Sequence, residues 1–267
     1  MAPLPMDSGP KSSSSLVHPE LMSATVRNAL VTGGTKGIGK AVVRRLLSEG
    51  HRVTAVYRQD ENARQQCAQE LATAGLEATF ERVDVRDPAA VLALFGQLAR
   101  SGRDPDFLVN AAGMTRDAPL AFLGVADFDE VLAANLRSTF LTCQQGIKGM
   151  VRRRFGRIVN FASPAALQGN EGQVAYAAAK AGVLGLTRSL AREVGRFGIT
   201  VNAVSPGLVL TEMTAQLSQE RRGELLRRIP LQRLGTAEEI AGMVSMLCHE
   251  NAAYVTGQCL SIDGGLT

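Results

Sequence analysis

The sequence predicts an α/β domain in which a parallel sheet lies between two layers of helices. Two observations carry this prediction. From Val26 onward, short β-branched or apolar runs alternate with amphipathic stretches of roughly 10 to 25 residues, a pattern typical of βαβ units. A glycine-rich turn joins the first apolar run to the first amphipathic stretch. Parallel strands need crossover connections, and helices on both faces then bury the sheet.

The elements follow one another along the chain in this alternation. We expect strands at residues 28–32, 52–57, 78–83, 107–110, 157–161, 200–204 and 260–262. We expect helices at 37–49, 60–74, 87–100, 174–197 and 237–248, and one long helix or two short ones at 126–153. Gly50 closes the first helix, and Asp87 opens the third. Strands in this order form a Rossmann-like, doubly wound sheet within a single three-layer α/β/α domain.

Composition bounds the kind of partner. The chain of 267 residues is 45% hydrophobic and 20% charged, which is ordinary for one large soluble domain. Its net charge of +4 indicates a mildly basic surface, which suits anionic small molecules or acidic partners. Aromatic residues make up only 4%, whereas proteins that stack nucleic-acid bases place aromatic side chains beside basic patches. We therefore expect no nucleic-acid partner.

The scattered cysteines and histidines exclude two further classes. The four cysteines form no CxxC pair, which favours a reduced compartment over a disulfide-stabilised secreted fold. The three histidines lack metal-ligand spacing, so we expect no metal site. No apolar run reaches the roughly 20 residues that a membrane span needs. The expected location is the cytoplasm, with an organelle matrix as the alternative.

Residues 1–25 differ in composition from the rest of the chain. They contain four prolines and a run of serines from Ser12 to Ser15, and they lack the apolar segment of a secretory signal. This composition predicts a disordered extension that precedes the structured domain at 26–267. Met22 is an alternative start of the chain.

The first expected strand leads directly into the sequence TGGTKGIG at residues 32–39. Gly33 permits a tight turn, and Gly37 and Gly39 allow a pyrophosphate to approach the positive N-terminus of the following helix. A Walker loop is excluded because no Gly-Lys-Ser or Gly-Lys-Thr follows. The predicted dinucleotide contacts in this loop are Gly33, Thr35, Lys36, Gly37, Ile38 and Gly39.

The end of the second expected strand indicates which dinucleotide binds. NAD sites usually place an Asp or Glu there, about 20 residues past the glycines, to hold the ribose hydroxyls. Here the strand ends in Tyr57 and Arg58, and no carboxylate follows until Asp60. Arg58 can pair with a 2′-phosphate that an acidic residue would repel, and Lys36 can add a second cation. We therefore expect NADPH.

Three further side chains predict a proton-transfer group. Ser163 precedes Tyr176 by thirteen residues, and Lys180 follows Tyr176 by one helical turn on the same face. A free tyrosine with a pKa of about 10 is a poor acid at neutral pH, but a neighbouring ammonium lowers that pKa. Ser163 can donate a hydrogen bond to the same carbonyl oxygen. Beside a nicotinamide site, this group predicts carbonyl reduction with Tyr176 as proton donor.

Together, these motifs resemble the short-chain dehydrogenase/reductase family over residues 26–267. The resemblance implies that Ser163, Tyr176 and Lys180 are catalytic, that Asn135 holds a water in a proton relay, and that Lys180 also holds the ribose. Tyr176 and Lys180 would therefore contact the cofactor as well. The further cofactor contacts that it implies are Asp84, Val85, Asn110, Ala111, Gly113, Pro206, Gly207, Val209 and Thr211.

Within that family, three stretches are similar to bacterial 3-oxoacyl-acyl-carrier-protein reductases, namely AGMTRD at 112–117, GNEGQVAY at 169–176 and IPLQRLG at 229–235. The similarity implies reduction of a 3-oxoacyl thioester on acyl carrier protein. Acetoacetyl-CoA or a polyketide intermediate is the alternative substrate, and a non-catalytic NADP-binding sensor or scaffold is the alternative from another class. Pro164 departs from the small or β-branched residue common after the catalytic serine, and this bears on acyl specificity.

Two surface features concern macromolecular partners. The arginines Arg152, Arg153, Arg154 and Arg157 are close in sequence. They are either a solvated helix end, where cations suit the helix dipole, or a docking site for an acidic carrier protein or the phosphates of coenzyme A. The stretches 126–150 and 174–190 carry more apolar residues than one buried face needs. We expect a homo-oligomer built on them, which by the resemblance is a tetramer.

Overall fold

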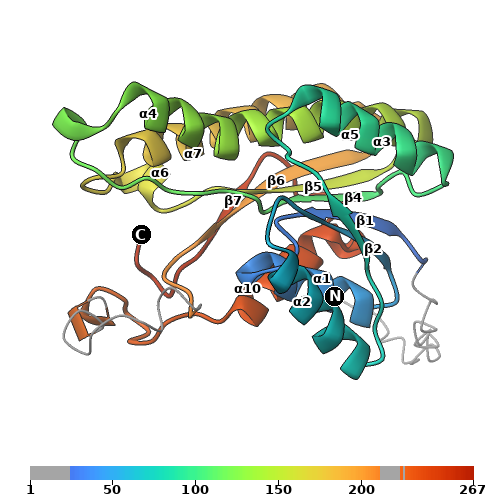
Figure 1. Cartoon of the computed structure of the whole chain (residues 1–267), viewed down its shortest axis with the longest axis horizontal. Coiled ribbons are helices and arrows are strands. Elements are labelled where there is room, and N and C mark those ends of the chain that lie inside the picture. Colours follow the sequence, from blue (N-terminus) through green and yellow to red (C-terminus); the bar gives the residue numbers. More distant parts are fainter. Residues whose placement is uncertain (1–24, 211–222, 225) are drawn as a thin grey trace, which may run out of the picture.

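The computed structural model describes residues 25–210, 223, 224 and 226–267, and within them seven parallel strands form one sheet (Figure 1). The strands are β1 (Asn28–Thr32), β2 (Arg52–Tyr57), β3 (Thr79–Arg82), β4 (Phe107–Asn110), β5 (Gly156–Phe161), β6 (Ile199–Pro206) and β7 (Cys259–Ile262). Their order in the sheet is β3-β2-β1-β4-β5-β6-β7. The predicted fold class is confirmed, since every neighbouring pair is parallel.

Helices lie on both sides of the sheet (Figure 1). One side carries α1 (Gly37–Ser48), α2 (Glu61–Thr73) and α10 (Ala237–Cys248), and the other carries α3 (Pro88–Arg100), α4 (Val125–Leu132), α5 (Ser138–Arg153) and α7 (Val174–Val194). Val42 and Leu46 of α1 belong to the core on the first side, and Leu94 of α3 and Met150 of α5 to the core on the second. Burying such side chains stabilises the fold by roughly 1.5–3 kcal/mol each. Each layer of helices is therefore held by its own core.

The strand order creates a crevice above β1 and β4. β1 pairs with β2 on one side and with β4 on the other, so the winding of the chain reverses between them. Thr32 and Asn110 end these two strands in register. Ligands of open α/β sheets bind at such a switch point, beyond the carboxyl ends of the strands.

The segment 126–153, predicted as one long helix or two short ones, is a continuous helical segment interrupted by a π-helical turn. α4 leads into the π-turn Ala133–Arg137, and α5 follows directly. The hydroxyls of Ser138 and Thr139 donate to the carbonyl oxygens of Ala134 (2.7 Å) and Asn135 (2.8 Å) in this turn. π-turns occur frequently at functional sites, and this one contains a residue predicted to be catalytic, Asn135.

Some segments differ from the prediction or lie outside it. A short helix, α6 (Ala165–Gln168), follows β5 where no helix is predicted, because four residues are too few to show a helical period. The helix predicted to reach residue 197 changes at its end into the 3₁₀ turn Gly195–Phe197. The predicted disordered extension covers residues 1–25, of which 1–24 lie outside the described residues. None of the helices in the described ranges has the length and apolarity needed to cross a bilayer.

Candidate active site

The glycine-rich loop joins β1 to α1 at the switch point. Gly33 has a φ of +67°, and a Cβ there would lie 3.1 Å from the Cα of Ala112, so both the turn and the close approach require glycine. A Cβ at Gly39 would lie 2.2 Å from the carbonyl oxygen of Gly33, so the first turn of α1 packs directly on the loop. Thr35 is buried, and Ile38 lies in that first turn. The loop therefore brings the N-terminus of α1 to the crevice, an arrangement that fits a pyrophosphate.

The two cations predicted to contact a 2′-phosphate differ in their partners. Lys36 forms an ion pair with Asp60, the residue that caps the N-terminus of α2. Arg58, which follows β2, is exposed, and its guanidinium has no ion pair in the part of the chain that the structure describes. Arg58 is therefore available to an anion. Lys36 is less so, because it is already paired with the carboxylate of Asp60.

Asp84 and Asn110 lie near the crevice, but their side chains are bonded within the chain. The Asp84 carboxylate accepts hydrogen bonds of 2.7–3.1 Å from the Arg86 guanidinium, which lowers the pKa of Asp84. Asn110 is buried, donates to Asn160 Oδ1 at 2.9 Å and accepts from Thr142 Oγ1 at 2.7 Å. The Asn110 side chain thus braces β4 against β5 and α5, and a cofactor contact has to come from its backbone.

The segment after β4 crosses the start of the glycine-rich loop. The Ala112 amide donates to Thr32 Oγ1 at 3.1 Å, which ties this segment to the end of β1. Ala111 is half-buried beside it, and Val85, the other predicted contact on this side, is buried. The predicted residues around the crevice are therefore brought together, with Val85 contributing to the core.

Asn135 has a buried side-chain oxygen for which the described part of the chain offers no hydrogen-bond partner. Its Nδ2 donates to the carbonyl oxygens of Met114 (2.7 Å) and Val131 (2.9 Å), whereas its Oδ1 has no hydrogen bond within the described residues. A Cβ at Gly113 would lie 2.5 Å from this Oδ1 and 3.6 Å from Lys180 Nζ. The amide oxygen and the ammonium therefore meet beside Gly113, where only glycine leaves room. A water at this point would satisfy the orphaned oxygen and fits the predicted relay.

Ser163, Tyr176 and Lys180 form one cluster. Ser163 follows β5, and Tyr176 and Lys180 lie one turn apart in α7. Lys180 Nζ lies 5.5 Å from the centre of the Tyr176 ring and donates to the Phe161 carbonyl oxygen at 2.8 Å. The Ser163 hydroxyl accepts from the Ala165 amide at 3.3 Å, and Ser163 and Tyr176 line the same cavity. The geometry thus unites the three residues that the sequence predicts to be catalytic.

Burial controls the pKa of both titratable groups in this cluster. It raises the pKa of Tyr176, an effect that the hydrogen bond with Ser163 opposes and the charge of Asp117 reinforces. It also lowers the pKa of Lys180 to about 8. The expected net lowering of the Tyr176 pKa is not met in this structure, because burial is the largest cause and raises it. The Lys180 amine donates to the Phe161 carbonyl oxygen.

The shifted pKa of Lys180 predicts a pH-dependent stability. An unfolded chain holds a lysine proton up to a pKa of about 10.4, whereas the folded protein releases it at about 8. In this window the unfolded state binds more protons, so the free energy of unfolding rises with pH, by up to about 3 kcal/mol at 1.36 kcal/mol per unit. We expect the wild type to gain stability relative to Lys180→Met between about pH 7 and pH 10 in urea unfolding of both proteins. A constant difference between the two proteins would contradict the shift.

A cavity of about 310 Å³ opens beside Ser163 and Tyr176. Pro164 lines it directly after Ser163, as predicted for the residues around the acyl group. Leu208 and Leu266 line it from distant parts of the chain. The catalytic cluster therefore faces a cavity with both apolar and polar walls, as small-molecule sites do.

The segment after β6 borders this cavity. Pro206 and Gly207 line it, and a Cβ at Gly207 would lie 2.6 Å from the Cα of Asp263, so this crossing requires glycine. Val209 is buried, which gives its side chain a packing role. The predicted contact at Thr211 lies outside the described residues.

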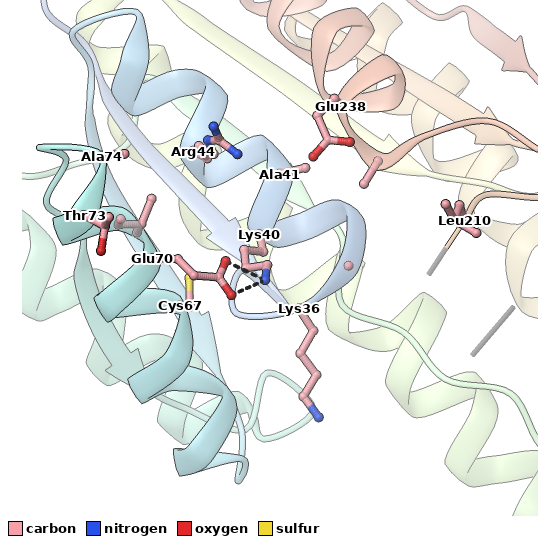
Figure 2. Close-up of a pocket in the computed structure, with 13 residues that line it drawn as sticks. Lys36, Lys40, Ala41, Arg44, Cys67, Glu70, Thr73, Ala74, Leu210 and Glu238 are labelled. Carbon is pink, nitrogen blue, oxygen red and sulfur yellow. Dashed lines mark hydrogen bonds and ion pairs between the residues drawn. The ribbon is translucent and has the colours of Figure 1, made fainter. Parts of the chain in front are cut away.

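A larger hollow, of about 930 Å³, lies beside the glycine-rich loop between α1, α2 and the start of α10 (Figure 2). Lys36 lines this hollow. Lys40 and Glu70 line it as well and are joined by hydrogen bonds of 2.8 and 3.0 Å. None of the predicted catalytic residues lines this hollow. Its size therefore does not make it the catalytic cavity.

The four arginines predicted as one cluster do not share one surface. Arg157 is 4% exposed and donates to backbone carbonyl oxygens. Arg152 and Arg153 pair with Asp104 at 3.7 and 3.4 Å. Arg154 is exposed and has no ion pair among the described residues, so the docking hypothesis rests mainly on this side chain. All four lie near the amino-terminal end of β5, whereas the catalytic cluster lies beyond its carboxyl end.

Sequence reasoning missed several residues of the site, among them Arg228, Leu266 and Asp117. Arg228 and Leu266 line the catalytic cavity, and no short-range pattern marks them, because folding brings them there from far along the chain. Asp117, whose charge acts on Tyr176, lies in the AGMTRD stretch, so the family resemblance could have singled it out.

Proteins of known sequence and structure resemble this chain over most of its length. A family model described as Enoyl-(Acyl carrier protein) reductase matches residues 33–267. The chain is 39% identical over 239 residues to the 3-oxoacyl-(acyl-carrier-protein) reductase FabG of Aquifex aeolicus, covering 89% of this chain and 96% of that protein. It is 38% identical over 240 residues to the FabG of Staphylococcus aureus strain Mu50, covering 90% and 98% respectively.

A solved structure agrees in fold. A crystal structure described as "a putative gluconate dehydrogenase" from Agrobacterium tumefaciens matches with a TM-score of 0.86 and 33% identity, over 90% of this chain and 95% of that one. The family match over residues 33–267 and these relatives show that the chain belongs to the short-chain dehydrogenase/reductase family of nicotinamide-dependent oxidoreductases.

Proposed function

We propose that this protein uses NADPH to reduce the ketone of a 3-oxoacyl thioester, carried by acyl carrier protein, to the 3-hydroxyacyl thioester. The observation that carries the proposal is the cluster of Ser163, Tyr176 and Lys180 at one cavity beside a dinucleotide loop. Identity of 38–39% to 3-oxoacyl-(acyl-carrier-protein) reductases supports the substrate class. A homo-oligomer in the cytoplasm is part of the same proposal.

In this reaction the chain's own residues handle the proton. The substrate carbonyl oxygen accepts hydrogen bonds from the hydroxyl groups of Ser163 and Tyr176. NADPH, when bound, supplies the hydride that forms the new C–H bond. As negative charge develops on the oxygen, Tyr176 transfers its proton to it, which leaves an alcohol and a phenolate. Lys180 stabilises the phenolate, and Asn135 holds the water through which Tyr176 regains a proton.

The residues at the site fit these roles in their resting state. Burial raises the pKa of Tyr176, so the phenol is protonated at neutral pH and can act as a donor. The unpartnered Oδ1 of Asn135 lies near the same point beside Gly113 as Lys180 Nζ, which gives the relay water an acceptor on one side and an ammonium on the other. The glycine-rich loop leaves space at a helix N-terminus for a pyrophosphate.

The substrate class can be tested by following NADPH absorbance with three additions to the purified protein. These are a 3-oxoacyl thioester on acyl carrier protein, acetoacetyl-CoA, and buffer alone. We expect the highest kcat/KM with the carrier-bound substrate. A preference for acetoacetyl-CoA would favour the alternative substrate, and NADPH binding without oxidation in all three would favour a sensor or scaffold.

Arg58 predicts the preference between the two cofactors. Arg58→Gln removes the exposed cation that follows β2, so we expect the KM for NADPH to rise about tenfold, which is about 1.4 kcal/mol. The KM for NADH should change less than about twofold, because NADH lacks the 2′-phosphate. Arg52→Gln, at the exposed other end of the same strand, is the matched control. A wild-type preference for NADH would contradict the assignment.

A further inference from the structure

The catalytic cavity contains a charge that the proposed chemistry does not use. Among the described residues that line it, Arg228 is the one charged side chain, and the others are apolar or neutral polar. Arg228 lines the same cavity as Ser163 and Tyr176. Neither hydride transfer nor proton transfer needs a cation at that wall. The Arg228 side chain is exposed, so a ligand in the cavity can reach it.

The backbone beside Arg228 is anchored. The next residue, Ile229, is 2% exposed, and a Cβ at Gly264 would lie 2.8 Å from Ile229 Cγ2. The Leu231 amide donates to the Gly264 carbonyl oxygen at 3.2 Å. This packing joins the segment to the C-terminal residues, of which Leu266 lines the same cavity. Arg228 therefore extends from a fixed point on the wall.

The guanidinium of Arg228 lacks a counter-charge within the described residues. Arg233, five residues later, shows the contrast, because its guanidinium pairs with Glu239 at 2.6 and 2.9 Å. An arginine fork binds carboxylate and phosphate oxygens in a bidentate manner, and such charge-assisted bonds are stronger than neutral ones. An unpaired fork on the wall of a substrate cavity is thus suited to an anionic group of the substrate.

We propose that Arg228 binds an anionic oxygen group of the substrate and so determines specificity. This proposal rests on the proposed function. The group is either the phosphate of a pantetheine-type carrier, as in coenzyme A and acyl carrier protein, or the carboxylate of a free oxo acid. Both can accept two parallel N–H···O bonds from the guanidinium.

The test compares Arg228→Gln with Arg227→Gln, a neighbouring exposed arginine that does not line the cavity. Each variant and the wild type are assayed with acetoacetyl-CoA, with the uncharged acetoacetyl-N-acetylcysteamine thioester, and with free acetoacetate. We expect Arg228→Gln to lower the ratio of kcat/KM for an anionic substrate to that for the neutral thioester about tenfold, or about 1.4 kcal/mol. Arg227→Gln should leave that ratio within about twofold.

The assays with acetoacetyl-CoA and with acetoacetate distinguish the phosphate from the carboxylate as the ligand of Arg228. A lowered ratio for acetoacetyl-CoA assigns the phosphate, and a lowered ratio for acetoacetate assigns the carboxylate. Unchanged ratios for both, or equal losses in both variants, overturn the role of Arg228. A weaker NADPH affinity in Arg228→Gln would also overturn it, since the anion would then belong to the cofactor.

A binding measurement keeps this role distinct from the reaction. Calorimetric titration of the NADP-bound protein with free coenzyme A and with pantetheine needs no turnover. We expect Arg228→Gln to weaken coenzyme A about tenfold relative to pantetheine if the phosphate is the ligand. Wild-type protein that oxidises NADPH with none of the substrates refutes the proposed function, while this titration still decides whether Arg228 binds the phosphate.

Discussion

Replacing Tyr176 by phenylalanine is expected to lower kcat by roughly 10²- to 10⁴-fold, the range that a positioned general acid contributes. The change removes only the hydroxyl group. The ring packs against a cluster that contains Val131, Ala175 and Ala179, and Phe retains those contacts. NADPH affinity and Tm should therefore stay close to the wild-type values. The measurements are steady-state turnover with the 3-oxoacyl substrate, fluorescence titration of NADPH and thermal unfolding.

A matched control is Tyr254→Phe, which removes a phenol hydroxyl from a fully exposed side chain away from the cavity. Its turnover should equal that of the wild type. Turnover of Tyr176→Phe within about threefold of the wild type would refute the donor role. An equal loss of NADPH affinity and turnover would instead assign Tyr176 to cofactor binding, since general-acid catalysis acts on kcat.

Gly39→Ala is expected to have the second largest effect, on cofactor affinity. The added Cβ would lie 2.2 Å from the carbonyl oxygen of Gly33, a backbone atom that cannot rotate away. Either the glycine-rich loop or the first turn of α1 must move, and both belong to the proposed pyrophosphate site. We expect the Kd for NADPH to rise more than about tenfold, with a lower Tm. Calorimetric titration with NADPH and thermal unfolding check this.

Gly242→Ala provides the matched control for that substitution. Gly242 lies in α10, outside the stretches on which an oligomer is expected, with nothing within 4 Å of an added Cβ. Alanine is favoured over glycine inside a helix by about 1 kcal/mol, so this variant should be as stable as the wild type or more so. Gly39 also lies in a helix, so helix propensity alone would make Gly39→Ala more stable than the wild type. A lower Tm in Gly39→Ala would therefore reflect the contact with Gly33. Unchanged NADPH affinity in Gly39→Ala would show that the loop does not form the pyrophosphate site.

Local patterns predicted most of the fold. The strands at 28–32, 52–57 and 107–110 and the helix at 237–248 coincide with β1, β2, β4 and α10. Apolar periodicity and helix-end signals are properties of neighbouring residues, so the sequence displays them directly. The segment 126–153 shows what such patterns do not distinguish. One long helix and two short helices have the same apolar period, so the sequence left both open. The π-turn at Asn135 is accompanied by hydroxyl groups that donate to its carbonyl oxygens, and apolar periodicity does not display such bonds.

In the candidate site, too, the sequence predicted some features and not others. Motif spacing placed Ser163, Tyr176 and Lys180, and the structure brings them together as predicted. Spacing does not report charge or burial. It could not show that Lys36 pairs with Asp60 or that Arg157 is buried.

The sequence by itself determined the doubly wound fold, the dinucleotide loop and the residue types of a carbonyl reductase, because each of these is written in short-range order. Only the tertiary structure decided which charges are neutralised and which remain free for a ligand. Arg233 and Arg228 lie five residues apart, yet the first pairs with Glu239 and the second faces the catalytic cavity without a counter-charge among the described residues. The physical reason is that pairing and desolvation depend on distances through space between residues that the chain brings together only when it folds.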